Sequence, residues 1–266
     1  MSQISFSHAG LMFSGYDVGQ GPAIVFQHGL GGDIGQINEA FPPLPVRRLT
    51  LECRGQGASP YGCPDELSIP NFAADVVDFA DRQGIGQFVV GGISMGAAIA
   101  LRIAAIMPQR VKAMILARPA WGWTSAPENM TVFKIISDFV EKQDHASFEA
   151  TALAQRFRQE APDNYASLMR LFEKPNPPMV AELHRRIAAS GPEISEAQVR
   201  AINVPTLVMA NAIDIIHPTS LATMLAETIP SAHYVELAPK VPDKAKHVAE
   251  FHVAVTHFLK DNEIIP

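Results

Sequence analysis

A serine between glycines carries the strongest chemical signal in the sequence. Residues 92–96 read Gly-Ile-Ser-Met-Gly, which matches the G-x-S-x-G pattern of a serine nucleophile. An apolar run at 87–91 leads into it, and the helix-forming stretch 97–101 leads away. Small glycines let a strand and a helix approach closely around a sharp turn that presents the serine hydroxyl. The pattern predicts Ser94 as a nucleophile, against the alternative of a serine that only caps a helix.

A serine hydroxyl needs a base to take its proton and an acid to orient that base. Asp214 follows the apolar run 206–210, and His247 follows the run 233–237, at the threshold of the last helical segment. The chain order Ser94, Asp214, His247 is the order in which strand ends bring such groups to one site. We therefore predict a triad in which Ser94 attacks, His247 takes and returns the proton, and Asp214 orients His247.

Other residues compete for these roles. His217 lies close to Asp214 in the chain and is a rival base, whereas His28 is expected to make a structural hydrogen bond. His247, His252 and His257 are spaced five residues apart. Five residues turn a helix by about 140°, so these histidines cannot share one helix face, which argues against a metal site there. The remaining alternatives are the acids Asp17, Asp33 and Asp243 and the histidines His252 and His257.

Catalysis by serine also needs N–H groups that hold a developing oxyanion. The glycine-rich segment 28–32 follows the apolar run 23–27, and such backbone can turn an N–H toward a substrate. The second donor in such sites is the residue after the nucleophile. The predicted donors are therefore the backbone N–H groups of Leu30 and Met95.

Short apolar runs separated by helical patterns position these residues. Nearly continuous apolar runs suit strands that are buried on both faces of a parallel sheet, and their alternation with helices indicates an α/β protein. The predicted strands are residues 23–27, 46–51, 87–91, 112–117, 206–210 and 233–237, and the predicted helices are 70–83, 94–107, 219–229 and 248–260.

The strand pattern stops in the middle of the chain, where the composition becomes helical. Chain breakers border this part, with Pro119 before it and Gly191-Pro192 after it. We predict a core of residues 1–119 and 193–266, with a helical cap, or lid, at 120–192. Side chains near the first border are candidate substrate-binding residues, although packing of the junction or a salt bridge to a local acid are alternatives: Trp121, Trp123, Met130, Phe133 and Arg118.

Composition excludes several other classes. The 266 residues carry 21 Lys and Arg against 27 Asp and Glu, a formal net charge of −6, so nucleic acid and anionic membranes are not expected partners. Signal-peptide and membrane-spanning patterns are not visible, and we expect a cytoplasmic monomer or homodimer. Cys53 and Cys63 are expected to be free thiols. Nucleotide-binding and zinc-binding motifs are also not visible, so no cofactor or metal is predicted.

The motifs together resemble the α/β-hydrolase superfamily, in the branch of capped serine hydrolases that includes esterases, lactonases and carbon–carbon bond hydrolases. The resemblance covers roughly residues 20–119 and 196–260. Two departures stand out: Glu52 replaces the Asp of the family's D-x-R-G-x-G-x-S turn, and Lys246 replaces a common Gly before the base. The motifs are HGLGG (28–32), ECRGQGAS (52–59), GISMG (92–96), NAIDIIHP (211–218) and KAKHV (244–248).

The resemblance implies a mostly parallel eight-stranded sheet and a cofactor-free hydrolase. Its expected substrate is a small to medium carboxylic ester or lactone, cleaved through an acyl-enzyme as by a carboxylesterase or lactonase. Two alternatives remain: a carbon–carbon hydrolase that acts on a diketone-like substrate with the same triad, and a ligand receptor that keeps the triad but turns over slowly. The cap shows no family pattern, so it does not choose between them.

Overall fold

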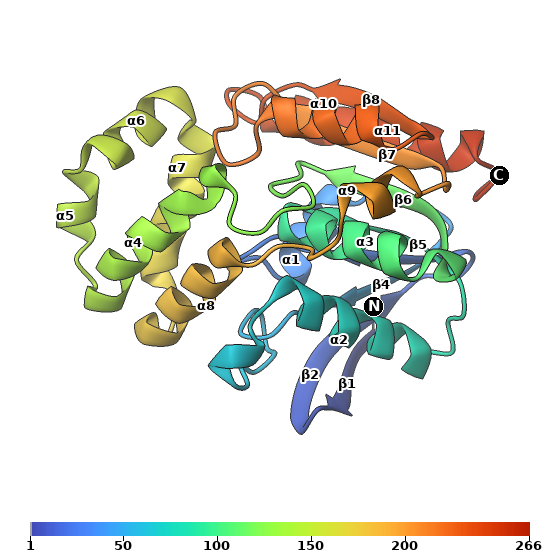
Figure 1. The fold of residues 1–266 in the computed structure, drawn as a ribbon, viewed down its shortest axis with the longest axis horizontal. Helices are drawn as coiled ribbons and strands as arrows, with labels where there is room; N and C mark the ends of the chain where they lie inside the picture. The colour runs from blue at the N-terminus through green and yellow to red at the C-terminus, as the bar shows by residue number, and fades with distance from the viewer. Residues whose placement is uncertain (1) are drawn as a thin grey trace.

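Eight strands form one sheet in the computed structural model, which describes residues 2–266 (Figure 1). Their order across the sheet is β1-β2-β4-β3-β5-β6-β7-β8. β1 pairs with β2, and β2 with β4, in antiparallel fashion, whereas all other pairs are parallel. This confirms the predicted mostly parallel eight-stranded sheet. The strands are β1 (Ser2–His8), β2 (Leu11–Val18), β3 (Ala23–Gln27), β4 (Arg47–Leu51), β5 (Phe88–Ile93), β6 (Val111–Ala117), β7 (Thr206–Asn211) and β8 (Ala232–Leu237).

The central strands are buried on both faces, which explains their continuous apolar sequences. Every residue of β5 and of β7 is buried. Each of the six predicted strands corresponds to an observed strand, with ends that differ by no more than a residue or two. The sequence analysis missed the β1–β2 hairpin, which lies at the sheet edge. β2 mixes buried and partly exposed positions, so it lacks the apolar run of a central strand.

Helices cover both faces of the sheet (Figure 1). On one face α3 contacts β5, β6 and α2, and on the other α1 contacts α11. Two apolar clusters result: Val90 and Ile99 belong to the first, and Phe26 and Phe251 to the second. Within residues 2–266, no helix is both long and apolar enough to cross a membrane. The helices of this part are α1 (Ile34–Ala40), α2 (Ile69–Arg82), α3 (Met95–Ile106), α9 (Glu196–Arg200), α10 (Thr219–Thr228) and α11 (Lys244–Asp261).

Residues 120–192, between β6 and α9, contain five α-helices and no strand, and Figure 1 shows these helices gathered beside one end of the sheet. We call this part the insertion. Trp121 lies at its neck, where the indole Nε1 donates to the carbonyl oxygen of Ser190 at 3.0 Å. This bond joins the segment that enters the insertion to the segment that leaves it. A function of the insertion as a lid remains a prediction. The helices are α4 (Thr131–Lys142), α5 (His145–Glu149), α6 (Ala152–Glu160), α7 (Pro162–Met169) and α8 (Pro177–Ala189), with the short 3-10 helix η4 (Arg170–Glu173) between the last two.

The glycines around Ser94 permit a close approach of backbones. A Cβ atom on Gly96 would lie 2.3 Å from the carbonyl oxygen of Gln27, and one on Gly92 would lie 2.6 Å from the same oxygen. Real Cβ atoms do not approach a fixed backbone that closely, so a larger residue forces β3 and α3 apart. The two glycines of the motif are therefore required by packing.

We expect Gly96→Ala to destabilise the fold by about 1–3 kcal/mol, because the added methyl group overpacks against backbone. For a domain of this size the melting temperature should fall by several degrees. Gly86→Ala is the matched control, since a Cβ there meets nothing within 4 Å. Thermal unfolding followed by circular dichroism measures both variants. Equal melting temperatures for the two would contradict the packing argument.

Candidate active site

Ser94 occupies the turn between β5 and α3. Its backbone has φ 57° and ψ −109°, a region that a residue with a side chain rarely adopts. The backbone N–H of Ser94 donates to the carbonyl oxygen of Ala117 at 2.9 Å, which fixes the turn against β6. Only 8% of the residue is exposed. Strain of this kind is typical of functional positions, and here it presents one hydroxyl beyond the end of the strand.

A hydrogen-bonded series runs from Ser94 through His217 to Asp214. His217 Nε2 lies 2.8 Å from Ser94 Oγ, and His217 Nδ1 lies 2.8 Å from Asp214 Oδ1. Because a carboxylate only accepts, Nδ1 carries the proton and donates to Asp214. Nε2 is then the acceptor and can receive the hydrogen bond of the serine hydroxyl. The three side chains thus have the contacts of a nucleophile, a base and an orienting acid.

The loop after β7 supplies both Asp214 and His217. Asp214 Oδ1 also accepts from the backbone N–H of His217 at 3.0 Å, so the carboxylate closes the turn as well as binding the ring. Asn164 of α7 accepts at its Oδ1 from the N–H groups of Ile215 and Ile216. A second insertion residue, Asn129, donates to the carbonyl oxygen of Ile216 at 2.7 Å. The insertion therefore helps to position the histidine.

The structure differs from the sequence prediction in which histidine meets Ser94. The predicted base, His247, bonds through Nδ1 to the carbonyl oxygen of Ala238 at 2.7 Å. α11 begins at Lys244, earlier than predicted, because Asp243 accepts from the N–H of Lys246 and caps it, so His247 lies within the first turn of the helix. Both oxygens of Asp214 are occupied by His217 and Arg118. The rival histidine of the sequence analysis, His217, takes the place predicted for His247.

Arg118 binds the carboxylate from the other side. It follows β6 directly with φ 48°, and its Nε donates to Asp214 Oδ2 at 2.8 Å. A second guanidinium nitrogen lies 3.3 Å from Asp163 of α7. The predicted alternative for Arg118, a salt bridge to a local acid, is what the geometry shows. The guanidinium therefore joins the core to the insertion through two carboxylates.

Burial and neighbouring charges set the protonation states of Asp214 and His217. Burial raises the pKa of Asp214, but Arg118 and His217 outweigh that effect and hold the pKa far below its usual value. Burial lowers the pKa of His217; Asp214 opposes this, while Arg118 adds to the lowering. The net direction leaves His217 neutral at pH 7, as a base must be.

The glycine-rich segment 28–32 lies beside the nucleophile. A Cβ on Gly29 would lie 3.3 Å from the Cβ of Ser94. Gln36 and Gln56 accept from the N–H groups of Gly29 and Gly31, at 2.7 and 2.6 Å. By contrast, the backbone N–H groups of Leu30 and Met95 have no acceptor within residues 2–266. These are the two donors that the sequence analysis predicted.

The turn at residues 52–59 holds that segment in place. Glu52 accepts from the N–H groups of Ala58 and Ile34, at 2.8 and 3.3 Å, so its carboxylate links the turn to the start of α1. The N–H of Cys53 donates to His28 Nε2 at 3.1 Å, which gives His28 the structural role that the sequence predicted. Cys53 is buried and Cys63 exposed, and both are free thiols. The Glu that replaces the family's Asp thus serves as a structural residue.

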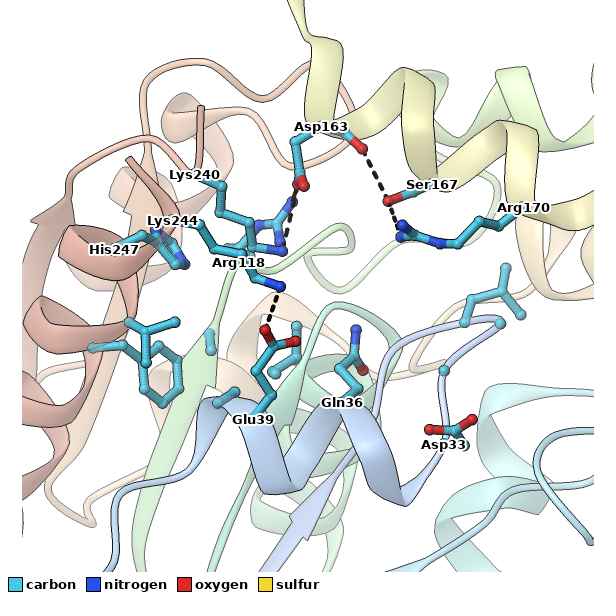
Figure 2. A pocket seen from close by; sticks show the side chains of 18 of the residues that line it. Asp33, Gln36, Glu39, Arg118, Asp163, Ser167, Arg170, Lys240, Lys244 and His247 are labelled. Atoms are coloured by element: carbon cyan, nitrogen blue, oxygen red, sulfur yellow. Dashed lines mark hydrogen bonds and ion pairs between the residues drawn. The ribbon is translucent and has the colours of Figure 1, made fainter. Parts of the chain in front are cut away.

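A cavity of about 440 Å³ adjoins these groups, between the insertion, α1 and α11 (Figure 2). Leu30, Gly31 and Ile93 line it next to the turn of Ser94, whereas Ser94, His217 and Asp214 are not among its lining residues within the described chain. Of the predicted substrate-binding residues, Arg118 and Phe133 line it, whereas Trp121, Trp123 and Met130 are not among its lining residues within the described chain. Several lining side chains are polar residues that the sequence analysis did not single out for binding: Asp163, Ser167, Arg170, Lys174, Lys240 and Lys244.

Comparison with known families places this fold. The family model described as "alpha/beta hydrolase fold" matches residues 22–179. The chain belongs to the alpha/beta hydrolase family, which confirms the family resemblance of the sequence motifs. A relative in Stutzerimonas stutzeri, named "Putative carbamate hydrolase RutD", is 27% identical over 223 residues, which span 79% of this chain and 81% of the relative.

Solved structures show the same fold. The enol-lactonase of Burkholderia xenovorans LB400 superposes with a TM-score of 0.69 at 21% identity, covering 98% of this chain and 99% of that one. A thermophilic esterase of Thermogutta terrifontis gives a TM-score of 0.71 at 21% identity, covering 99% of this chain and 97% of that one. At such identities the likeness concerns the fold, and the reaction must be argued from the site.

Proposed function

We propose that the protein is a serine hydrolase that cleaves a small to medium carboxylic ester or lactone through an acyl-enzyme. The observation that carries the proposal is the hydrogen-bonded series Ser94, His217, Asp214, with 2.8 Å at each link. Esterase and lactonase structures of the same fold, and the carbamate hydrolase relative, agree with acyl transfer to water. In this proposal His217, rather than His247, is the base.

The proposed reaction has two halves. In the first, Ser94 Oγ attacks the carbonyl carbon while His217 Nε2 takes the hydroxyl proton, and Asp214 stabilises the charged ring. The backbone N–H groups of Leu30 and Met95 hold the oxyanion, a contribution of about 3–4 kcal/mol per donor in comparable sites. His217 then protonates the leaving oxygen. In the second half, water attacks the acyl carbonyl carbon while His217 takes its proton, and the bond to Ser94 Oγ then breaks as His217 returns a proton to that oxygen and the acid is released.

The insertion, residues 120–192, is proposed to act as the lid of this site. Its helices supply Asn164, which holds the loop that carries His217, and Phe133, which lines the cavity. Such a cover excludes water and strengthens the electrostatic interactions beneath it. The substrate's acyl portion is proposed to lie in the cavity between the insertion and α1.

Acid release measured by pH-stat tests the proposal. The panel consists of a short-chain ester, a longer-chain ester, a lactone, a carbamate ester and a diketone, each offered to the same protein. Release from an ester or the lactone supports the proposal and identifies the preferred class. Release from the diketone alone favours the carbon–carbon hydrolase instead. Tight binding of the panel without turnover favours the receptor alternative.

The pH dependence of kcat/KM should report the base. Protonation of His217 removes its acceptor nitrogen, so activity should fall as the pH drops through a pKa that lies below the ordinary histidine value of about 6.5. Arg118→Gln removes a neighbouring cation, which raises the pKa of His217 and moves the acidic limb to higher pH. Rates between pH 4.5 and 8 measure the shift. Arg200→Gln, a change at an exposed arginine that pairs with Glu196, should leave the limb in place.

A further inference from the structure

The insertion places two cations on the cavity without neutralising them. Arg170 and Lys174 both line the cavity, and Figure 2 shows the side chain of Arg170 extending into it. Arg170 donates to Ser167 Oγ at 2.9 Å, a neutral partner that leaves other guanidinium N–H groups available. Neither cation has a carboxylate partner among the described residues. This part of the wall can therefore accept an anion.

The other cations of the cavity are already paired. Asp163 lies 3.3 Å from Arg118 and 3.4 Å from Lys240, and Lys244 pairs with Glu39. Lining side chains in the described chain include five cations and only three carboxylates, Asp33, Glu39 and Asp163. The whole protein has a formal net charge of −6. Asp214, behind the cavity wall, also pairs with Arg118, so the lining cations without a carboxylate partner among the described residues are Arg170 and Lys174.

These cations lie beside the segment that carries the proposed oxyanion donor. Leu171, between them in the chain, would lie 3.6 Å from a Cβ on Gly31. Lys174 is close enough to contribute to lowering the pKa of His28 at the start of that segment, where burial is the main cause. With the acyl portion of the substrate in this cavity, as proposed above, an anion held here would be carried on that acyl portion.

We propose that Arg170 and Lys174 bind a carboxylate carried on the acyl part of the substrate, so that the preferred substrate class is the monoester of a dicarboxylic acid or the corresponding carboxylated lactone. A guanidinium fork matches the two oxygens of a carboxylate, and an ammonium adds a point charge. The choice of ester substrate rests on the proposed function, whereas the anion site itself rests on the cavity and its charges.

A matched pair of chromogenic esters tests the preference. Mono-4-nitrophenyl glutarate carries a free carboxylate, and 4-nitrophenyl pentanoate has an acyl chain of equal length without one. We expect the wild type to favour the glutarate ester at low ionic strength. In the double variant Arg170→Gln/Lys174→Gln the ratio of kcat/KM for the two esters should fall tenfold or more, as expected for a lost charged hydrogen-bonding group. Arg156→Gln, an exposed arginine paired with Glu160 on α6, should keep the ratio.

Binding separates this inference from the proposed function. Calorimetric titration with glutarate reports the anion site whether or not any ester is cleaved. Glutarate binding that the double variant loses supports the site. If both esters are cleaved with equal efficiency and glutarate binds neither protein, the inference is overturned while the hydrolase remains. If neither ester is cleaved, the proposed function fails and the glutarate titration alone decides the anion site.

Discussion

Ser94→Ala should lower kcat by a factor of about 10⁴ to 10⁶ on the best substrate of the panel, because no other group replaces the nucleophile. The side chain of Ser94 makes one hydrogen bond, to His217, and the backbone bond to Ala117 does not need it. Alanine has the same steric limits at φ 57°, so the turn should persist. We therefore expect a folded protein that has lost its reaction.

The measurement is acid release by pH-stat, with circular dichroism and thermal unfolding to show that the variant is folded. Ser147→Ala, an exposed serine of α5 in the insertion, is the matched control and should keep full activity. Residual turnover by Ser94→Ala within a factor of ten of the wild type would refute the proposed nucleophile. Such a result would direct attention to another chemistry in the same cavity.

The parts of the fold that the sequence predicts are those with one dominant physical cause. β5 and β7 are predictable because burial on both faces demands an unbroken apolar run. The β1–β2 hairpin lacks such a run, because β1 lies at the sheet edge and β2 mixes buried and partly exposed positions, although the two strands pair locally across a two-residue turn. The start of α11 could be predicted from Asp243, which is a strong N-cap residue, although the lysines of the first turn oppose the helix dipole.

The candidate site also contains residues that local sequence predicts and residues that depend on tertiary packing. Ser94 is predictable because a local motif imposes its geometry, and Asp214 because it follows a buried strand. The choice of histidine depends on which ring reaches Ser94 and Asp214 in space, and chain order does not contain that distance. One local sequence feature favours His217. A carboxylate three residues earlier can accept both from the backbone N–H of the histidine and from its ring. No local sequence pattern predicts the contact between Asp163 and Lys240, because it forms only when the insertion packs on the core.

The second large effect distinguishes the two histidines. His217→Ala should lower kcat by a factor comparable to that for Ser94→Ala, because members of such a group act as a unit. His247→Ala should lower kcat by less than about tenfold, since His247 bonds to the carbonyl oxygen of Ala238 and not to Asp214 or Ser94. His247 also lines the cavity, so its variant should act more on KM than on kcat.

The rate at which an organophosphate such as diisopropyl fluorophosphate labels Ser94 gives an independent readout, because it depends on activation of the hydroxyl and not on recognition of an acyl group. Labelling should slow by orders of magnitude in His217→Ala and remain fast in His247→Ala. The opposite pattern would mean that His247, in the first turn of α11, reaches Ser94 during the reaction, and that His217 holds Asp214 and Arg118 in place without taking the proton. Since each variant removes one imidazole, and His217 contacts Ser94 in the structure whereas His247 contacts Ala238, the comparison identifies which of the two histidines receives the proton of Ser94.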